Sequence, residues 1–356
     1  MSQRRCLLAL DRALWQLLWL LAAGSAWALL AIERILNLHE GVLRTAGLVL
    51  GLVLVTGSAS FAARRLRHSS LRYLPCLFLA LVAIREWRRH VLREAYAASP
   101  PVRSVGPSQS FWHPVTTTDV TLRYYTLGSK HLESDRLRLV LLSDLHMTGA
   151  LPLSYHQHVL DLVAAQNADL ILLTGDYVSE AENIEFMAHV FARRSPARLG
   201  AFAVLGNHDF WTDADRIRRV LSSGNVTLLE GTCQPLPSKI GRVTLCGTDA
   251  PWGPELSSAL DRSQLNLVLS HSPDNIYRLG ELGASLVFSG HTHGGQIRVP
   301  LLGAPVIPSR YGRIFDQGHF RVDGVDLFVS TGIGAGMPPL RIFCPPEILV
   351  VDITRE

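Results

Sequence analysis

The sequence predicts an α/β fold of four layers, an α/β/β/α sandwich, preceded by an N-terminal helical transmembrane segment. Five short runs rich in Leu and Val, each followed by turn-forming residues, are typical of buried strands in a parallel sheet. Helical patterns lie between these runs, as they do in βαβ units. The C-terminal stretch lacks helical periodicity and contains short strands separated by Gly and Pro, which indicates a second sheet packed on the first.

The N-terminal segment, residues 1–96, contains three apolar stretches. Residues 13–32 and 45–63 have the length of membrane-spanning helices, and we predict that both cross a bilayer. Residues 73–84 are shorter, include Pro75 and are flanked by Arg, which suits an interfacial or re-entrant helix better than a third span. The alternative is that all three stretches are buried helices of a soluble domain.

Positive charge is concentrated in the same segment. Residues 1–103 hold fourteen Arg, no Lys and five acidic residues, a balance of +9 against +4 for the whole chain. The remainder therefore carries −5, and a membrane surface explains the basic segment better than nucleic acid does. With two spans, only Arg34 and Arg44 lie in the connecting loop, so the positive-inside rule predicts that the C-terminal domain faces the cytoplasm. A third span would place that domain on the other face.

Residues 97–111 are rich in Pro, Ser and Gly and predict a linker, and residues 112–356 predict one folded domain. Thr, Val and Tyr content predicts that a strand in residues 116–127 enters this domain. The five buried strands are predicted at residues 137–142, 170–173, 201–205, 265–269 and 286–288. The second sheet is predicted from residues 243–246, 297–299, 320–322, 325–329 and 348–353.

Each of the five buried strands ends in side chains with nitrogen or oxygen donors. In chain order these segments are Ser-Asp144-Leu-His146, Gly-Asp176-Tyr-Val, Gly-Asn207-His208-Asp209, Ser-His271-Ser-Pro-Asp and Gly-His291-Thr-His293-Gly-Gly. Ligands of open α/β sheets bind outside the carboxyl ends of the strands, so five strands ending this way at one edge describe a single site. Alone, the first segment is typical of an ordinary polar loop and the second of a turn after a strand. The third is a stronger signal, because short polar residues after an apolar run suit a turn that presents side chains, with a plain Asn/Asp turn as the alternative. The paired His of the last segment are the most specific signal.

Carboxylate, imidazole and amide groups together suit divalent ions such as Mn²⁺, Fe²⁺ or Zn²⁺, and we predict a two-metal hydrolase site. No Cys lies beside these donors, which argues against a structural zinc site. Histidines outside the segments are predicted to be exposed or hydrogen-bonded structural residues: His113, His131, His156, His158, His189 and His319.

The five cysteines form no C-x-x-C pair, and their odd number argues against a disulfide framework. Cys233 and Cys246 could face each other across a hairpin, but we predict two buried thiols. This cysteine usage favours a reducing compartment.

The ordered segments DLH, GDYV, GNHD, SH and GHTHGG resemble the calcineurin-like metallophosphoesterase superfamily over residues 136–353. The longer run GHTHGGQIRVPLLG, with CPPEI near the C-terminus, is similar to the membrane-attached bacterial branch of YkuE- and YaeI-type enzymes. This resemblance and the N-terminal segment imply a multi-pass protein of the bacterial inner membrane.

By motif position, the resemblance implies one metal ion held by Asp144, His146, Asp176 and His293, and a second held by Asp176, Asn207, His271 and His291. Asp176 would bridge the two ions. His208 would contact the phosphate and protonate the leaving oxygen, with Asp209 orienting its ring. Mn²⁺ is the expected ion, with Fe²⁺, Zn²⁺ and Mg²⁺ as alternatives. GDYV lacks the Asp-Arg-Gly continuation of protein Ser/Thr phosphatases, which disfavours that activity.

We therefore expect a membrane-anchored phosphoesterase that hydrolyses phosphate ester or pyrophosphate bonds of a lipid-linked substrate. One alternative is a phosphodiesterase for soluble nucleotides or other small phosphoesters, with the membrane segment only an anchor. A third, a binding module that has lost activity, is disfavoured because no ligand of the set is missing. The partners expected are a lipid bilayer and the substrate, with no nucleic acid. The sequence leaves the oligomeric state open.

Overall fold

The computed structural model describes residues 16–23, 55, 59, 62, 74–108, 110–192, 197–300, 303–336 and 338–356. The chain divides into two compact units, Met1–Glu94 and Ala95–Glu356, and each is described by itself. The linker boundaries predicted at residues 96 and 111 stay predictions.

The first unit contains most of helix α4 (Leu74–Tyr96), which includes the third apolar stretch and continues through Arg85, Arg88 and Arg89. Among the described residues, no helix combines the length and the apolar content that crossing a membrane requires. The spans predicted at residues 13–32 and 45–63 lie outside the described residues, apart from the helical residues 16–23, 55, 59 and 62.

A seven-stranded sheet in the second unit has the strand order β1-β2-β13-β3-β4-β5-β6. Strands β3 to β6 are parallel, while β13 pairs parallel with β2 and antiparallel with β3. The bounds are β1 Arg103–Val105, β2 Thr121–Ser129, β3 Arg136–Leu142, β4 Leu170–Leu173, β5 Ala201–Ala203, β6 Val226–Leu228 and β13 Glu347–Arg355.

A six-stranded sheet has the order β11-β12-β10-β9-β8-β7. Its four central strands, β12, β10, β9 and β8, are parallel, and each edge strand is antiparallel to its neighbour. The bounds are β7 Cys233–Pro235, β8 Val243–Thr248, β9 Leu265–Ser270, β10 Leu286–Ser289, β11 Gly318–Val322 and β12 Val325–Val329.

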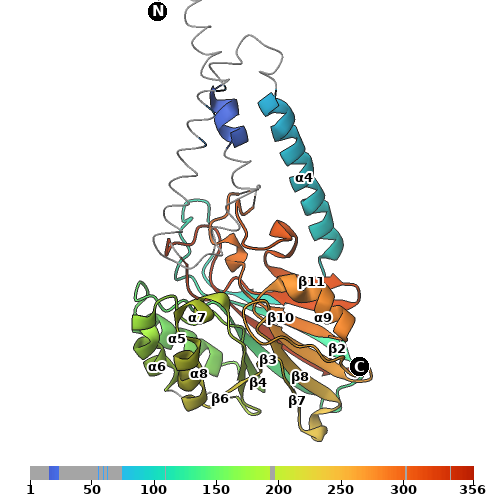
Figure 1. The fold of residues 1–356 in the computed structure, drawn as a ribbon. Coiled ribbons are helices and arrows are strands. Elements are labelled where there is room, and N and C mark those ends of the chain that lie inside the picture. The colour runs from blue at the N-terminus through green and yellow to red at the C-terminus, as the bar shows by residue number, and fades with distance from the viewer. Residues whose placement is uncertain are drawn as a thin grey trace, which may run out of the picture. The chain divides into compact units, whose positions relative to one another are not determined.

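Three apolar clusters define how these elements pack. One joins the seven-stranded sheet to α5 (Leu153–Ala164), α6 (Ile184–Phe191) and α8 (Ala214–Ser223), one fills the space between the sheets, and one joins the six-stranded sheet to α9 (Ile276–Leu282). Figure 1 shows α5, α6 and α8 grouped together on one side of the strands. Along β3, Val140 contacts the helices while Leu139 and Leu141 face the other sheet, as the two-residue strand period requires. Burial of each such Leu contributes about 1.5–3 kcal/mol. The predicted mixed α/β fold with two sheets is confirmed.

The helices of the second unit that follow α4 are short. The α-helices of the second unit are α5 Leu153–Ala164, α6 Ile184–Phe191, α7 Asn207–Thr212, α8 Ala214–Ser223 and α9 Ile276–Leu282. The 3₁₀ turns are η3 Ala181–Asn183, η4 Ser238–Ile240, η5 Pro273–Asn275, η6 His293–Gly295 and η7 Gly312–Phe315. Asp213 begins α8 by accepting a hydrogen bond from the Arg216 amide, and Gly224 ends it.

Three details of the predicted strand arrangement are wrong. The five donor-bearing strands do not share one sheet, because β3, β4 and β5 belong to the seven-stranded sheet and β9 and β10 to the other. Strand β13, predicted in the second sheet, lies inside the first between β2 and β3. Residues 297–299 make only isolated bridges. Strands that are buried on both faces have similar apolar sequences in either sheet, so the hydrophobic pattern does not predict to which sheet a strand belongs.

The prediction of two separate thiols is also wrong. Cys233 and Cys246 form a disulfide between β7 and β8. The two residues are direct partners in the antiparallel register, and this brings their side chains together on one face of the sheet. Cys344 is a buried free thiol.

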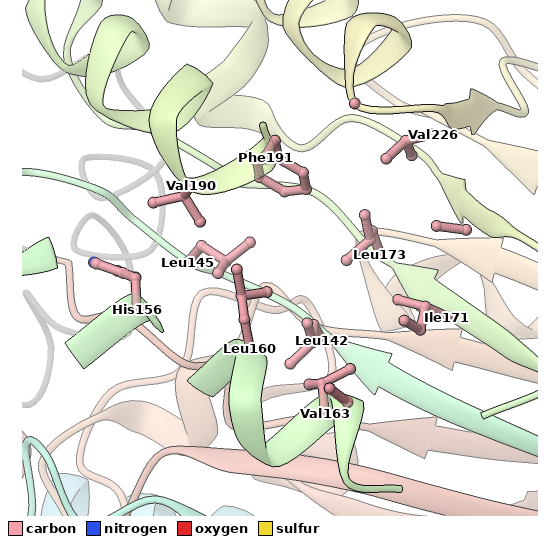
Figure 2. Close-up of a pocket in the computed structure, with 13 residues that line it drawn as sticks. Leu142, Leu145, His156, Leu160, Val163, Ile171, Leu173, Val190, Phe191 and Val226 are labelled. Carbon is pink, nitrogen blue, oxygen red and sulfur yellow. The ribbon is translucent and has the colours of Figure 1, made fainter. Parts of the chain in front are cut away.

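An apolar cavity of about 100 Å³ lies between the seven-stranded sheet and its covering helices (Figure 2). Leu142, Leu173 and Val226 line it from the sheet side, and Leu160 and Phe191 from the helices. His156 also lines it, and neither of its ring nitrogens has a hydrogen-bond partner among the residues that the structure describes. Burial lowers the pKa of His156 to about 4, so the ring is neutral near pH 7. The prediction that His156 is exposed or hydrogen-bonded is therefore wrong.

Candidate metal centre

The seven side chains predicted as metal ligands gather at the carboxyl ends of strands from both sheets. Asp144 and His146 follow β3, Asp176 follows β4, and Asn207 opens α7 after β5. His271 follows β9, and His291 and His293 follow β10. The site therefore straddles the junction of the two sheets and belongs to neither alone. All of these side chains are buried except that of His293, which is partly exposed.

The donor atoms of Asp144, His146, Asp176 and His293 form the first group, all within 4.8 Å of one another. The Nε2 atoms of His146 and His293 are 2.9 Å apart. His146 Nε2 lies 3.5 Å from Asp176 Oδ2, and His293 Nε2 lies 3.5 Å from Asp144 Oδ1. These are the four residues predicted to hold the first ion.

The second group consists of Asp176, His271 and His291, with the side chain of Asn207 beside them. His271 Nε2 lies 3.3 Å from Asp176 Oδ2 and 3.1 Å from both Asn207 Oδ1 and His291 Nδ1. Asp176 belongs to both groups, which is the position that a bridging carboxylate requires. The structure thus brings together every residue predicted for the second ion.

The chemistry of these donors fits two divalent cations. In both groups, imidazole nitrogens face each other and a carboxylate at close range inside the protein, a crowding of lone pairs that a cation would relieve. The hydrogen bonds on the far side of two rings support this orientation: His271 Nδ1 lies 2.7 Å from the Thr174 carbonyl oxygen, and His146 Nδ1 lies 2.7 Å from Ser179 Oγ. Such partners fix the ring and leave Nε2 to the metal.

The backbone at the site is strained in the same way at five of the seven predicted ligands. Asp144, His146, Asp176, His291 and His293 all have φ between 36° and 67°. For residues other than Gly this left-handed conformation costs about 1–3 kcal/mol each and collects at functional sites. Two glycines make room for the loops: a Cβ at Gly290 would lie 2.2 Å from Asp144 Oδ2, and one at Gly206 would lie 2.2 Å from Asp176 Oδ1.

Electrostatics place positive charge beside Asp176. Burial alone would raise the pKa of Asp176, but the neighbouring His271 and His208 hold it well below its usual value. Burial opposes the charged form of His271, yet Asp176 raises the pKa of His271 to about 9. Burial lowers the pKa of His146 and of His291 to about 3, so both rings are neutral, the form that binds metal. A protonated His271 therefore supplies the positive charge beside Asp176, and a divalent cation bound there would replace that proton.

The two residues predicted to be catalytic have different surroundings. The His208 ring lies 4.6 Å from the His146 ring and 5.0 Å from the Trp211 ring, measured between centroids, at the border of the first group. The carboxylate of Asp209 accepts hydrogen bonds from the backbone amides of Asp176, Tyr177 and Gly206 at 2.8–2.9 Å. Asp209 therefore ties the β4 loop to the β5 loop, a role that the sequence did not suggest.

Sequence reasoning missed two residues that touch the ligands. Arg341 is fully buried, donates to the carbonyl oxygens of Thr331 and Gly334, and has its Nη2 atom 3.5 Å from His293 Nδ1. The ring of Trp252 lies 5.7 Å from that of His271 and 5.2 Å from that of His291. Arg341 and Trp252 both follow Pro-containing loops and belong to none of the sequence motifs. No local pattern therefore predicts that they contact the metal-ligand candidates.

A fold of two sheets with this buried carboxylate and histidine cluster at their junction defines a class of protein, the metal-dependent phosphoester hydrolases. Comparison with known proteins agrees, because residues 137–295 match the family model "Calcineurin-like phosphoesterase". The chain belongs to the calcineurin-like phosphoesterase family, and the predicted resemblance is confirmed.

The relatives include the Escherichia coli phosphodiesterase YaeI, 30% identical over 222 residues that span 61% of this chain and 82% of that protein. The uncharacterized metallophosphoesterase YkuE of Bacillus subtilis is 26% identical over 250 residues, which cover 68% of this chain and 86% of that protein. The UDP-2,3-diacylglucosamine pyrophosphatase LpxG of Chlamydia trachomatis is 25% identical over 296 residues, which cover 67% of this chain and 89% of that protein.

Proposed function

We propose that this protein is a membrane-anchored phosphoesterase that hydrolyses a phosphate ester or pyrophosphate bond in a lipid-linked substrate, with two Mn²⁺ ions as the cofactor. The observation that carries the proposal is the pair of donor groups sharing Asp176. Two divalent ions held there would neutralise charge on the phosphoryl oxygens and lower the pKa of the attacking water. The name of the LpxG relative, a pyrophosphatase for a diacylated sugar nucleotide, supports a lipid-linked substrate.

The side chains have separate tasks in this proposal. Asp144, His146 and His293 would hold one ion together with Asp176, and Asn207, His271 and His291 would hold the other together with Asp176. His208 lies next to the first group and is the residue that protonates the leaving oxygen, because imidazole titrates near the working pH. Asp209 acts indirectly by holding the backbone at Asp176.

A second candidate is a phosphodiesterase for soluble nucleotides or other small phosphoesters. The name of the YaeI relative, a phosphodiesterase with no lipid in the description, favours it. In that case the N-terminal segment would only fix the location of the enzyme.

Phosphorus NMR of the detergent-purified protein with Mn²⁺ separates the two candidates. The panel contains phospholipids, UDP-diacylglucosamine and soluble esters, and Asp176→Ala serves as the blank. Cleavage of lipid-linked phosphates is expected, and the new resonance identifies which P–O bond breaks. Turnover of soluble esters alone would select the second candidate, and no turnover of any compound would contradict both.

For location, we propose the bacterial inner membrane with the catalytic domain on the cytoplasmic face, from the Arg distribution. The Cys233–Cys246 disulfide opposes this assignment, because the cytoplasm keeps thiols reduced. Thiol alkylation of intact cells followed by mass spectrometry decides between them. Two alkylated thiols support the cytoplasmic face, whereas a disulfide in freshly trapped protein would place the domain on the opposite face.

A further inference from the structure

The second unit exposes a group of large apolar side chains on adjoining loops. Trp112 is 82% exposed, Phe111 69%, Val115 55% and Val299 40%. Single exposed apolar residues are ordinary on soluble proteins, but a contiguous group with two large aromatic rings marks an interaction surface. We call Phe111, Trp112, Val115, Val299 and Phe343 the aromatic rim.

Ring contacts and backbone bridges show that the rim is one surface. The Phe111 ring packs edge-on against Trp112 at 5.5 Å and stacks on Phe343 at 6.3 Å, between centroids. Val115 forms a bridge with Ile342, and the Phe343 amide donates to the Pro114 carbonyl oxygen. Phe343 has φ of 48°, a conformation that a bulky side chain rarely adopts and that the surrounding hydrogen bonds must hold.

The rim is fastened to the metal centre through the segment on which Phe343 lies. The thiol of Cys344 donates to the His293 carbonyl oxygen at 3.2 Å, and Arg341 Nη2 lies 3.5 Å from His293 Nδ1. Ile342 donates to the Gln296 carbonyl oxygen and accepts from the Arg298 amide. The residues on each side of Phe343 therefore contact the loop that carries a predicted metal ligand.

Basic side chains adjoin the rim at Val299. The backbones of Val299 and Gly303 exchange two hydrogen bonds, and the guanidinium groups of Arg298 and Arg313 lie near Gly303. Arg298 Nη1 lies 2.8 Å from Asp316 Oδ2, and Nε of the exposed Arg310 lies 3.6 Å from Asp274 Oδ2. Aromatic rings beside Arg are the composition that favours the headgroup region of a bilayer with anionic lipids.

The position of the rim in the chain also favours a bilayer as its occupant. Phe111 follows the end of α4 by only fifteen residues. That helix exposes Leu77, Leu81, Ile84 and Trp87 along one face, and it closes the Arg-rich, apolar segment of residues 1–96. Fifteen residues of chain span at most about 50 Å, so a bilayer that binds α4 is within reach of Phe111 and Trp112.

We propose that the aromatic rim inserts into the surface of a lipid bilayer and thereby presents the metal centre to phosphate groups of membrane lipids. This inference rests on the proposed function for the substrate, but insertion itself can be measured without turnover. The acyl chains of a lipid substrate would remain in the bilayer while its phosphate group reaches the metal centre. The rim would therefore favour phosphates that lie at a membrane surface, without a pocket that binds the acyl chains.

Depth-dependent fluorescence quenching tests insertion directly. The full chain, with Cys6 and Cys76 changed to Ser, carries a bimane label at Trp112→Cys, or at Ser222→Cys as the control, because Ser222 is exposed at the end of α8, far along the chain from α4. Each protein is reconstituted in vesicles of phosphatidylethanolamine and phosphatidylglycerol, with or without doxyl-labelled phosphatidylcholine. Quenching at position 112 but not at 222 is expected. Equal quenching at both positions, or none at 112, overturns the proposal. A label at position 112 that becomes shielded only as the protein concentration rises would indicate contact between copies of the chain and also overturns it.

A kinetic comparison measures the consequence for catalysis. The Phe111→Ser/Trp112→Ser protein should turn over a lipid-linked phosphoester in vesicles about tenfold more slowly, while turnover of soluble bis(4-nitrophenyl) phosphate stays within about twofold. Equal loss on both substrates overturns the proposal. A wild-type protein that cleaves only the soluble ester refutes the lipid-linked substrate, and quenching at position 112 would then still support the insertion of the rim.

Discussion

The two sheets contribute different chemistry to the same site. The seven-stranded sheet supplies both carboxylates and the amide, through Asp144, Asp176 and Asn207, together with one imidazole. The six-stranded sheet supplies imidazoles only, through His271, His291 and His293. Each predicted ion therefore takes ligands from both sheets, with Asp176 common to the two. The metal centre is therefore complete only when the two sheets are docked, so metal binding and docking of the sheets stabilise each other.

The largest effect should come from the one residue that both ions share. Asp176→Ala is expected to lose both ions and to lower turnover by roughly 10³-fold or more, because it removes the bridging carboxylate. Asn207→Ala should lose one ion, since its side chain adjoins only the second group. Metal content of the purified proteins is the measurement. Full occupancy in Asp176→Ala would refute the bridging assignment.

His208 lies beside the donors without belonging to either group, so its loss should separate chemistry from metal binding. His208→Ala is expected to keep both ions and to lose about 10²–10⁴ in turnover of an alkyl phosphoester, the usual contribution of a general acid. A 4-nitrophenyl ester needs less protonation of its leaving oxygen and should lose less. Equal losses on the two esters would argue against the role of general acid.

Removal of the metal ions should weaken the whole domain because the ligands join the two sheets. At ion concentrations about 100-fold above the dissociation constant, each bound ion stabilises the domain by about 2.7 kcal/mol, so two ions contribute about 5.4 kcal/mol, or about 11–22 °C in Tm for a domain of this size. Scanning calorimetry with Mn²⁺ and with EDTA measures the shift. Asp176→Ala is the control and should show none; an equal shift in that variant would mean that the ions stabilise the fold from another place.

The smallest expected effect is on the pH dependence of stability and comes from His156. Unlike the histidines of the metal centre, His156 lies in an apolar cavity away from the carboxylates. Its folded pKa of about 4 lies below the ordinary value of 6.5, so acid favours the unfolded chain. Stability from this source is complete above pH 6.5 and should fall by about 2 kcal/mol between pH 7 and 5. His156→Phe, in an apolar cavity between Tyr155 and Phe186, should flatten this part of the pH dependence of Tm. An unchanged slope would contradict the buried neutral ring.

Most of the donor set could be predicted from the sequence because each donor directly follows an apolar run. Asp144, Asp176, Asn207, His271 and His291 stand at strand ends, where the chain must turn and side chains collect at one edge. The division of these strands between two sheets could not be predicted, since β3 and β9 have equally apolar sequences and are buried on both faces. Pairing partners depend on tertiary packing that no local pattern contains.

The contacts of the residues that support the metal-ligand candidates could not be predicted from the sequence either. Arg341 reaches His293 because the segment before β13 crosses the six-stranded half of the site, a contact between residues 48 positions apart. The resemblance implied that Asp209 orients the His208 ring; in the structure its carboxylate accepts hydrogen bonds from the amides of Asp176, Tyr177 and Gly206, which no local pattern predicts. The disulfide forms because Cys233 lies directly opposite Cys246 in the antiparallel pairing of β7 with β8. The three-residue sequence of β7 does not specify that register.

The central claim is a two-ion centre bridged by Asp176 across the two sheets. A crystal of the protein grown with Mn²⁺, measured at the manganese absorption edge, tests it most directly. We predict two anomalous peaks about 3.5–4 Å apart, one on each side of the Asp176 carboxylate, with Asn207 at one and His293 at the other. A single peak, or peaks that Asp176 does not touch, would contradict it.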